Sequence, residues 1–489
     1  MQIPHLIGTI LLIAYSVVPL WAQDIAPPST EDNSNPILTL QSVLTRVEQN
    51  HPLLRGSQTE RIVASGKLLT ALGKFEPNLV NDWELERLVK DGKTTSVGFN
   101  DTLVEMRHPW GIQGFAGFRA GIGDVEVADL GIHTSNQPLL GIIFPLLRGF
   151  ITNPAHAELQ KSSLANKQAE LEIQQSRQDV YLGAATQYWS WVAARKILAL
   201  REKAVAVAED RASQLAKQAK AGARAKFDVI EANQEVQRRR ERLIKARRQI
   251  DQEQYKLALF LWEDNGVVVP TKWKSPPFPS VLSSQELKLD EQDQRRATAI
   301  RPEVQLVHLE AESNHIDLEV AANNFLPDLT IEAAPSRKPE DFVLGLGYRF
   351  GAQLSFPFLQ REARGDELQM KGKAQRLKLL QQYRLQQVSM DVANARSAIT
   401  RAQERTQVAR QALQLAKKIE KGERTRFKLG ATTLLFVNLR ERNVLKAAEG
   451  WITAMADYQK GLSLYRWAIG EWVSAPSFAD FDKKRMEKS

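Results

Sequence analysis

Two octapeptides, GARAKFDV at residues 222–229 and GATTLLFV at residues 430–437, decide how this chain folds. Each lies within a long stretch without proline, 155–269 and 358–475, and opens with Gly-Ala. From the last residue of each octapeptide, apolar residues recur every seventh position, and the two series match at a constant offset. The series are Val229, Val236, Leu243, Ile250 and Leu257, and Val437, Val444, Trp451, Tyr458 and Tyr465. This strict period predicts supercoiled helices that pack on neighbouring helices.

The stretch that leads into each turn is long enough to form a rod. Residues 155–221 contain no proline and one glycine, Gly183. At about 1.5 Å per residue, a helix of this span is roughly 100 Å long. Such a helix cannot be the core of a compact domain. The Gly-Ala turn then sends the chain back, so we expect each half to end in a long antiparallel helical hairpin.

The chain is a duplication, and its other landmarks repeat as well. Pro52 and Pro77 in the first half match Pro302 and Pro327 in the second, both pairs being 25 residues apart. The expected organisation is a signal peptide at 1–22, a first repeat at 23–263, a Pro-rich linker at 264–296, a second repeat at 297–471 and a charged tail at 472–489. Each repeat should hold a helix, a strand region (about 78–145 and about 328–357) and a long helical hairpin (about 154–263 and about 360–470).

Between the first helix and the hairpin, the apolar period changes from helical to two. In residues 342–356 apolar side chains alternate with small or polar ones, and a similar pattern occupies 110–122. The residues expected to face lipid are Phe342, Leu344, Leu346, Tyr348, Phe350 and Leu354. Residues 79–88 and 329–333 are expected to be their partner strands. A half-buried strand of a soluble sheet shows the same alternation, so the pattern alone leaves both possibilities open.

The amino-terminal residues indicate export. An apolar stretch from Leu6 to Leu20, followed by Ala22, is typical of a secretory signal peptide. Cysteine is absent, which excludes disulfides, thiolate metal sites and a cysteine nucleophile. Beyond residue 22, no apolar run reaches the roughly 18 residues of a membrane-spanning helix, so a spanning structure would have to be a closed sheet.

Two repeats of helix, strands, long helix, Gly turn and returning helix, behind a signal peptide, resemble the TolC family of outer-membrane efflux proteins. The resemblance covers about residues 40–470, and its most specific fragments are Phe-Pro-Leu-Leu at 144–147, Phe-Pro-Phe-Leu at 356–359 and the first octapeptide. It implies an α+β membrane protein with a two-repeat TolC-like fold. Three copies would form a 12-stranded β-barrel, four strands from each, continued by a long α-helical coiled-coil barrel.

The resemblance also implies that the protein transports substrates without catalysing a reaction. Such a protein is the outer-membrane channel of a tripartite efflux or type I secretion system, extending into the periplasm. It is a passive exit duct for substrates delivered by an inner-membrane pump and a periplasmic adaptor (membrane fusion) protein. Its partners would be two further copies, the adaptor, the pump and outer-membrane lipid, with no cofactor and no nucleic acid. The periplasmic tip that docks the adaptor would comprise Gly222, Ala223, Phe227, Asp228, Val229, Gly430, Ala431, Thr432, Thr433 and Val437.

The sequence departs from the family's pattern in two places. The positions that match the arginine and acidic residues of the archetypal constriction hold Thr432, Phe436 and Leu439, and Asp228 alone keeps a carboxylate. Asp228, Phe436 and Leu439 are therefore the candidates for the tunnel constriction, and a more apolar closure is expected. The first strand region is also longer than the second. Its extra residues, between Lys90 and Gln137, are expected in an enlarged extracellular loop or an extended hairpin.

No catalytic constellation stands out, so neither enzyme activity nor a metal site is expected. The seven histidines are scattered and are expected at the surface. The basic run from Arg238 to Arg248 could bind nucleic acid, but it circles all faces of a helix and lacks interleaved aromatics, which favours a solvated face. The alternative function is a periplasmic coiled-coil adaptor or structural protein without a pore, although an adaptor would usually have one hairpin, not two.

Overall fold

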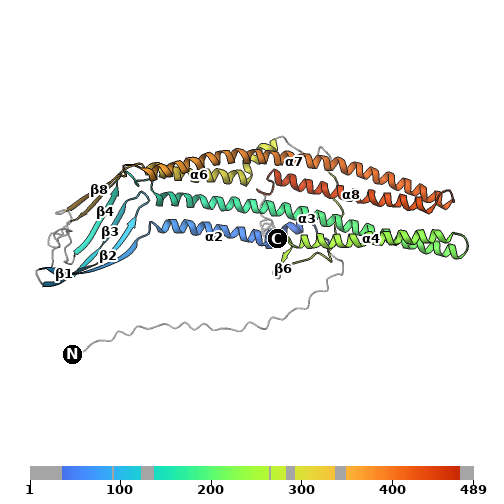
Figure 1. Ribbon diagram of the computed structural model, residues 1–489, viewed down its shortest axis with the longest axis horizontal. Coiled ribbons are helices and arrows are strands. Elements are labelled where there is room, and N and C mark those ends of the chain that lie inside the picture. Colours follow the sequence, from blue (N-terminus) through green and yellow to red (C-terminus); the bar gives the residue numbers. More distant parts are fainter. Residues whose placement is uncertain are drawn as a thin grey trace, which may run out of the picture.

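The computed structural model describes residues 36–90, 93–122, 137–263, 266–281, 292–335 and 348–473. The molecule is elongated, with a β-sheet at one end and the turns of two helical hairpins at the other (Figure 1). The expected signal peptide and nearly all of the expected charged tail lie outside the described residues.

Two helical hairpins account for most of the length. α3 (Pro154–Lys220) turns into α4 (Lys226–Ala258), and α7 (Arg361–Lys428) turns into α8 (Leu434–Ala468). α3 begins where the Asn153 side chain accepts a hydrogen bond from the His156 amide and Pro154 takes the first helical position. α3 has 67 residues and α7 has 68, so each is roughly 100 Å long. Within the described part of the chain, no helix has both the length and the hydropathy for crossing a bilayer.

Two shorter helices complete a slab that is four helices wide. α2 (Pro52–Gly73) lies along the part of α3 nearest the sheet, and α6 (Pro302–Asn323) lies between α3 and α7. The order across the slab is α2, α3, α6, α7 near the sheet and α4, α3, α8, α7 near the turns (Figure 1). α7 therefore forms one edge of the slab along its whole length, and α2 followed by α4 forms the other.

The described residues contain a sheet of six antiparallel strands, so the prediction of four strands per chain is wrong. The strands, in spatial order, are β1 (Asn78–Lys90), β2 (Lys93–Arg107), β3 (Gln113–Ile122), β4 (Gln137–Pro145), β7 (Asp328–Pro335) and β8 (Tyr348–Ser355). β4 was not predicted, and β2 was left open as part of an extended hairpin, because neither alternates cleanly between apolar and polar residues. β2 places Asn100 and Thr102 beside apolar neighbours, where both accept hydrogen bonds of 2.8 Å from Asn81 Nδ2. β4 is apolar on both faces, as the adjacent Leu139 and Leu140 show.

The strand register gives the sheet one apolar and one polar face. Directly opposed residues share a face, and the pairs Val104–Ala116, Ala116–Leu140 and Leu329–Leu354 belong to the apolar one. The apolar face carries Leu79, Trp83, Leu85, Val104, Met106, Ala116, Phe118, Leu140, Ile142, Phe144, Leu329, Ile331, Ala333, Phe350, Ala352 and Leu354, and it is interrupted by the polar Asn81, Asn100 and Thr102. The opposite face, called the polar face here, carries Asp82, Glu84, Asp101, Glu105, Arg119, Asp328, Thr330, Glu332, Gln353 and Ser355, together with the apolar Val80, Phe99, Leu103, Phe115, Leu139 and Ile143.

The largest hydrophobic core lies at mid-length, where α2 gives way to α4. α1 (Leu40–Asn50) and the short ribbon of β5 (Trp262–Glu263) and β6 (Gly266–Val267) pack there on the middle of α3. Trp191 and Leu257 are fully buried, and the Tyr188 hydroxyl donates to the Leu38 carbonyl at 3.0 Å. α5 (Gln292–Ile300) packs against α7 and α6. This mid-length core joins the half of the slab next to the sheet to the half next to the turns.

Candidate functional site

The two helical turns share one backbone geometry. Gly222 and Gly430 stand in the left-handed region, with φ of 76° and 74°. The Gly222 amide donates to the Ala219 carbonyl at 3.1 Å and the Ala223 amide to the Gln218 carbonyl at 2.9 Å, and the turn at Gly430 repeats both bonds. This pair of bonds is the Schellman motif, which glycine enters without a Cβ penalty. The repeated Gly-Ala therefore marks the C-cap of each long helix.

The expected docking residues lie around these turns, except for one that is in the core. Phe227 is 72% exposed, whereas Val437 is only 1% exposed. Gly222, Ala223, Gly430, Ala431 and Thr433 are exposed, and Asp228, Val229 and Thr432 are half-buried. Val437 cannot meet a partner without unfolding α8, so we leave it out of the docking surface. Exposed apolar side chains near the turns, called here the apolar tip, are Phe227, Ile230, Leu429, Leu435, Phe436 and Leu439.

The constriction candidates lie in the first turn of α4 and the first two turns of α8. Asp228 is in the first turn of α4, and Phe436 and Leu439 stand partly exposed on α8. The loop before α8 is tied back to α7, since a hydrogen bond from Thr432 is the largest of the effects that hold the pKa of Glu423 below its usual range. The sequence predicted that these three residues lie in one region, but it did not predict the hydrogen bond between Thr432 and Glu423.

A buried ionic cluster joins all four helices of the hairpins above the turns. Glu441 of α8 accepts hydrogen bonds from Arg211 Nη1 of α3 at 2.8 Å, from Arg239 Nη2 of α4 at 2.6 Å and from Arg424 Nη2 of α7 at 2.8 Å. Arg239 also donates to Glu235 Oε1 at 3.0 Å. We call these five residues the Glu441 cluster.

The arginines determine the charge state of this cluster. Burial by itself raises the pKa of Glu441, but the hydrogen bonds and charges of Arg211 and Arg239 outweigh burial and hold the pKa below its usual range. Glu441 is therefore ionised at neutral pH. Sequence analysis missed the cluster, and the one signal available was the helical spacing of Glu235 and Arg239, which are four residues apart.

The basic run of α4 is largely paired with carboxylates. Arg238 Nη1 lies 3.1 Å from Glu235 Oε2, and Arg240 Nη2 lies 2.6 Å from Glu209 Oε1. Lys245 has a similar contact one turn along its own helix. These ion pairs favour the interpretation of the run as a solvated, paired helix face.

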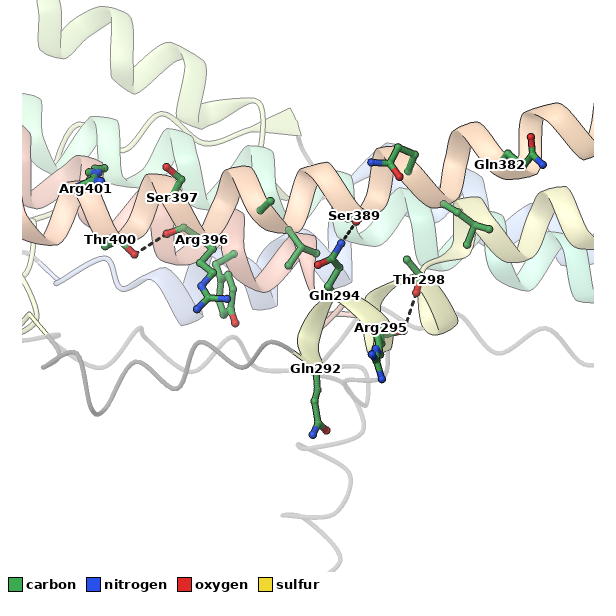
Figure 2. A pocket seen from close by; sticks show the side chains of 15 residues that line it. Gln292, Gln294, Arg295, Thr298, Gln382, Ser389, Arg396, Ser397, Thr400 and Arg401 are labelled. Carbon is green, nitrogen blue, oxygen red and sulfur yellow. Dashed lines mark hydrogen bonds between the residues drawn. The ribbon is translucent and has the colours of Figure 1, made fainter.

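A polar hollow of about 1080 Å³ lies between α5 and α7, at mid-length and away from the tip (Figure 2). Gln294 of α5 donates to Ser389 of α7, and Thr400 Oγ1 donates to the Arg396 carbonyl at 2.9 Å. Its lining is rich in Gln, Arg, Ser and Thr and has no carboxylate. Across the described ranges, no group of His, Asp or Glu is placed to hold a metal ion. The described lining of the hollow therefore offers no metal-ligand set.

Both edges of the slab display exposed apolar side chains. On the outer side of α7 they are Leu368, Leu379, Tyr383, Met390, Val408, Leu415 and Ile419, whereas the exposed Leu385 of the same helix lines the hollow. Their spacing along the helix keeps all seven within about 60° of one another, at 100° per residue. The opposite edge displays Ile62 and Leu69 on α2 and Ile244 and Tyr255 on α4. A row of apolar side chains along one helix face is a candidate interaction surface. We call these two sets the α7 edge and the α2–α4 edge.

The structure describes only some of the residues that were expected to face lipid in the second strand region. Phe350 and Leu354 are 68% and 67% exposed on the apolar face. Phe342, Leu344 and Leu346 lie outside the described residues, and so does the side chain of Tyr348.

One histidine corrects the expectation that all lie at the surface. His51, which precedes α2, is 6% exposed and stacks on Phe260 at 5.8 Å between ring centres. Burial lowers its pKa. His108, His308 and His315 are exposed as expected.

Comparison with known proteins places this fold among outer-membrane channels. No protein-family model and no curated protein matches the chain. Among solved structures, the outer-membrane channel OprN matches with a TM-score of 0.68 at 14% identity, over 89% of this chain and 90% of that one. The CmeC outer-membrane channel of Campylobacter jejuni matches with 0.66 at 14% identity, over 91% and 88%. A membrane protein from Pseudomonas aeruginosa matches with 0.68 at 15% identity, over 92% and 96%. These likenesses confirm the TolC-type fold that the sequence resemblance predicted.

Proposed function

We propose that this chain is the outer-membrane channel of a tripartite efflux or type I secretion system and serves as a passive exit duct. The observation that carries the proposal is a sheet with one largely apolar face, joined end-on to helices roughly 100 Å long. An apolar outer face backed by a polar inner face suits a strand wall between lipid and water. The sheet then lies in the outer membrane and the helices reach into the periplasm.

Three copies close the duct. The α7 edge and the α2–α4 edge are different surfaces, so copies pack head to tail, and a head-to-tail contact that closes on itself makes a ring. The polar face of the sheet then lines the lumen. The number three comes from the family resemblance, and the long apolar edges support the lateral contact itself.

Charge on the α7 edge should block this assembly. We expect Leu415→Glu and Val408→Glu to abolish the trimer, because each would bury a carboxylate in the contact between copies. Lys417→Glu is the matched control, since Lys417 is exposed about 180° around the same helix. The measurement is the slow-migrating species in unheated detergent gels. A stable trimer in both edge variants would exclude this contact.

The apolar tip is the docking surface for the adaptor, and through the adaptor for the pump. Its side chains are exposed at the end of the molecule farthest from the sheet, next to the two Gly turns. Asp228, Phe436 and Leu439, at the start of the returning helices, line the entrance when three copies meet.

Cell fractionation tests the proposed function as a whole. We expect the full chain in the outer-membrane fraction, as a heat-modifiable trimer that forms ion-conducting pores in planar bilayers. A monomer that stays soluble in the periplasm without detergent would instead establish the coiled-coil adaptor or structural protein.

A further inference from the structure

Among the described residues, the first repeat contains a hairpin that has no counterpart in the second. Pro77 precedes β1 as Pro327 precedes β7, and Pro145 ends β4 as Pro357 follows β8. By these landmarks β1 and β4 match β7 and β8. β2 and β3 are therefore an addition to the repeat, and they occupy much of the segment for which the sequence left a loop or an extended hairpin open.

We propose that β2 and β3 are part of the channel wall, so that three copies close a barrel of eighteen strands. The seam between copies lies between β1 of one and β8 of the next, the two end strands of the six-stranded order. This inference rests on the proposed function, which supplies the membrane location and the trimer.

The inserted hairpin is fixed to the helices at its helix-proximal turn. The Nδ2 of Asn153, the N-cap of α3, donates to the Pro109 carbonyl at 2.8 Å, and the Ile151 amide donates to the Trp110 carbonyl at 3.2 Å. Gly111 has a φ of 87° and lies so close to Gly149 that a Cβ would clash with its carbonyl oxygen. β2 therefore ends, and β3 begins, at the helix-proximal end of the sheet, level with the other strands (Figure 1).

Both inserted strands contribute residues to the apolar face and to the polar face of the sheet. Val104 and Phe118 extend the apolar face. On the polar face, Arg119 Nε donates to Asp101 Oδ1 at 2.6 Å, and the guanidinium lies 4.2 Å from the ring centre of Phe99. A hairpin that stood clear of the wall would expose its apolar face to water. In the wall, that face meets lipid and the ion pair faces the lumen.

Six strands also match the width of the helical slab. Strands about 4.8 Å apart and tilted by about 40° each take roughly 6.3 Å of circumference, so six cover roughly 38 Å and four cover roughly 25 Å. Four helices about 9 Å apart cover roughly 36 Å. Three copies with six strands each therefore close at nearly the circumference of the helical tunnel, without narrowing at the junction.

The end strands are also suited to form a seam. β1 leaves the helices and β8 returns to them, so β8 of one copy runs antiparallel to β1 of the next. Leu79 is the second residue of β1 and Leu354 is the last but one of β8, and both lie on the apolar face at the helix-proximal rim. Antiparallel pairing therefore continues unbroken around the ring.

Engineered cysteines test the seam, because the chain has no cysteine of its own. Leu79→Cys is combined with Phe350→Cys, Ala352→Cys or Leu354→Cys in three double variants, which are oxidised in outer membranes. We expect a ladder of covalent dimer and trimer on denaturing, non-reducing gels for at least one variant. Ala116→Cys on β3, combined with the same three β8 positions, is the matched control and should give no ladder.

A second set of pairs tests the strand order within one chain. Ala116→Cys with Leu140→Cys joins directly opposed residues of β3 and β4 and should form an intrachain disulfide. Leu79→Cys with Leu140→Cys should not, because β2 and β3 separate them.

The outcomes separate this inference from the proposed function. In a protein that still runs as a trimer, a ladder from the Ala116 pairs, a Leu79–Leu140 disulfide, or no ladder from any Leu79 pair would overturn the eighteen-stranded wall. The proposed function would survive each of these results. A wild-type chain that never forms trimers would overturn both.

Discussion

Replacing Glu441 with alanine should lower the free energy of unfolding by about 3–5 kcal/mol, because it leaves buried arginine charges without their shared carboxylate. Arg239 is 4% exposed and cannot easily turn to water, while Arg211 comes from another helix. The measurement is thermal or denaturant unfolding of the helices, followed by circular dichroism. Glu209→Ala is the control, since its pair with Arg240 is half-exposed and is expected to change stability by at most about 1 kcal/mol.

The difference between wild type and Glu441→Ala should depend on pH. The folded pKa of Glu441 lies below its ordinary value of 4.5, so its contribution is complete above about pH 4.5 and is lost as the pH falls through the folded pKa. The stability gap should therefore shrink in acid. A gap that kept its full size down to pH 3 would mean that packing, and not the carboxylate charge, supports the cluster.

The Glu441 cluster also matters for the geometry of the tip. Buried ion pairs are weak evidence for net stability, but they can fix the register of helices. This cluster links α3, α4, α7 and α8 just above the turns, so it sets how far each hairpin extends. Glu441→Gln keeps the shape and removes the charge. We expect it to loosen the tip, seen as faster proteolysis near the turns, before it affects the mid-length core.

The helices could be predicted because their signals are local. The absence of proline, the seven-residue period and the Gly-Ala caps each act within one or two turns of helix. The strands were harder, because β2 and β4 depend on their neighbours. Asn100 is tolerated on the apolar face through its bond to Asn81, and β4 is apolar on both sides. The six-stranded sheet thus arises from tertiary pairing that no alternation pattern marks.

The candidate site, like the fold, has a part that could be predicted from local sequence and a part that could not. The turns at Gly222 and Gly430 follow from the Gly-Ala signal. Val437 was assigned to the docking surface although it begins the second apolar series, and its own periodicity predicts a core position. The Glu441 cluster could not be found, because Arg211 and Glu441 meet only through the pairing of two hairpins far apart in sequence.

Gly430→Val should reduce adaptor docking and export at least about tenfold while leaving the trimer intact. A side chain in the left-handed region costs roughly 1–2 kcal/mol, and more for a β-branched residue. Each 1.4 kcal/mol against the docking-competent turn weakens binding about tenfold. The turn at Gly430 sets the positions of Leu429, Leu435 and Phe436 in the apolar tip. Backbone strain at this turn therefore affects docking directly. Gly222→Val should act in the same way at the first turn.

Two variants isolate the cause of this effect. Gly430→Asn should retain most docking, because asparagine enters the left-handed region more readily than valine. Gly422→Ala, inside α7 with open space around it, should behave as wild type. The measurements are export restored to a strain that lacks the gene and adaptor retained by the tagged trimer.

Comparing these variants shows whether docking requires the left-handed turn conformation or the glycine residue itself. Loss in Gly430→Val with retention in Gly430→Asn ties docking to the left-handed turn, because both substitutions add a side chain but differ in the strain they impose. Wild-type docking in both valine variants would contradict the tip assignment, and loss in Gly422→Ala would move the requirement from the turn to the helix. Because the strained residue lies at the far end of the molecule from the sheet (Figure 1), a trimer that persists in all four variants separates docking from assembly.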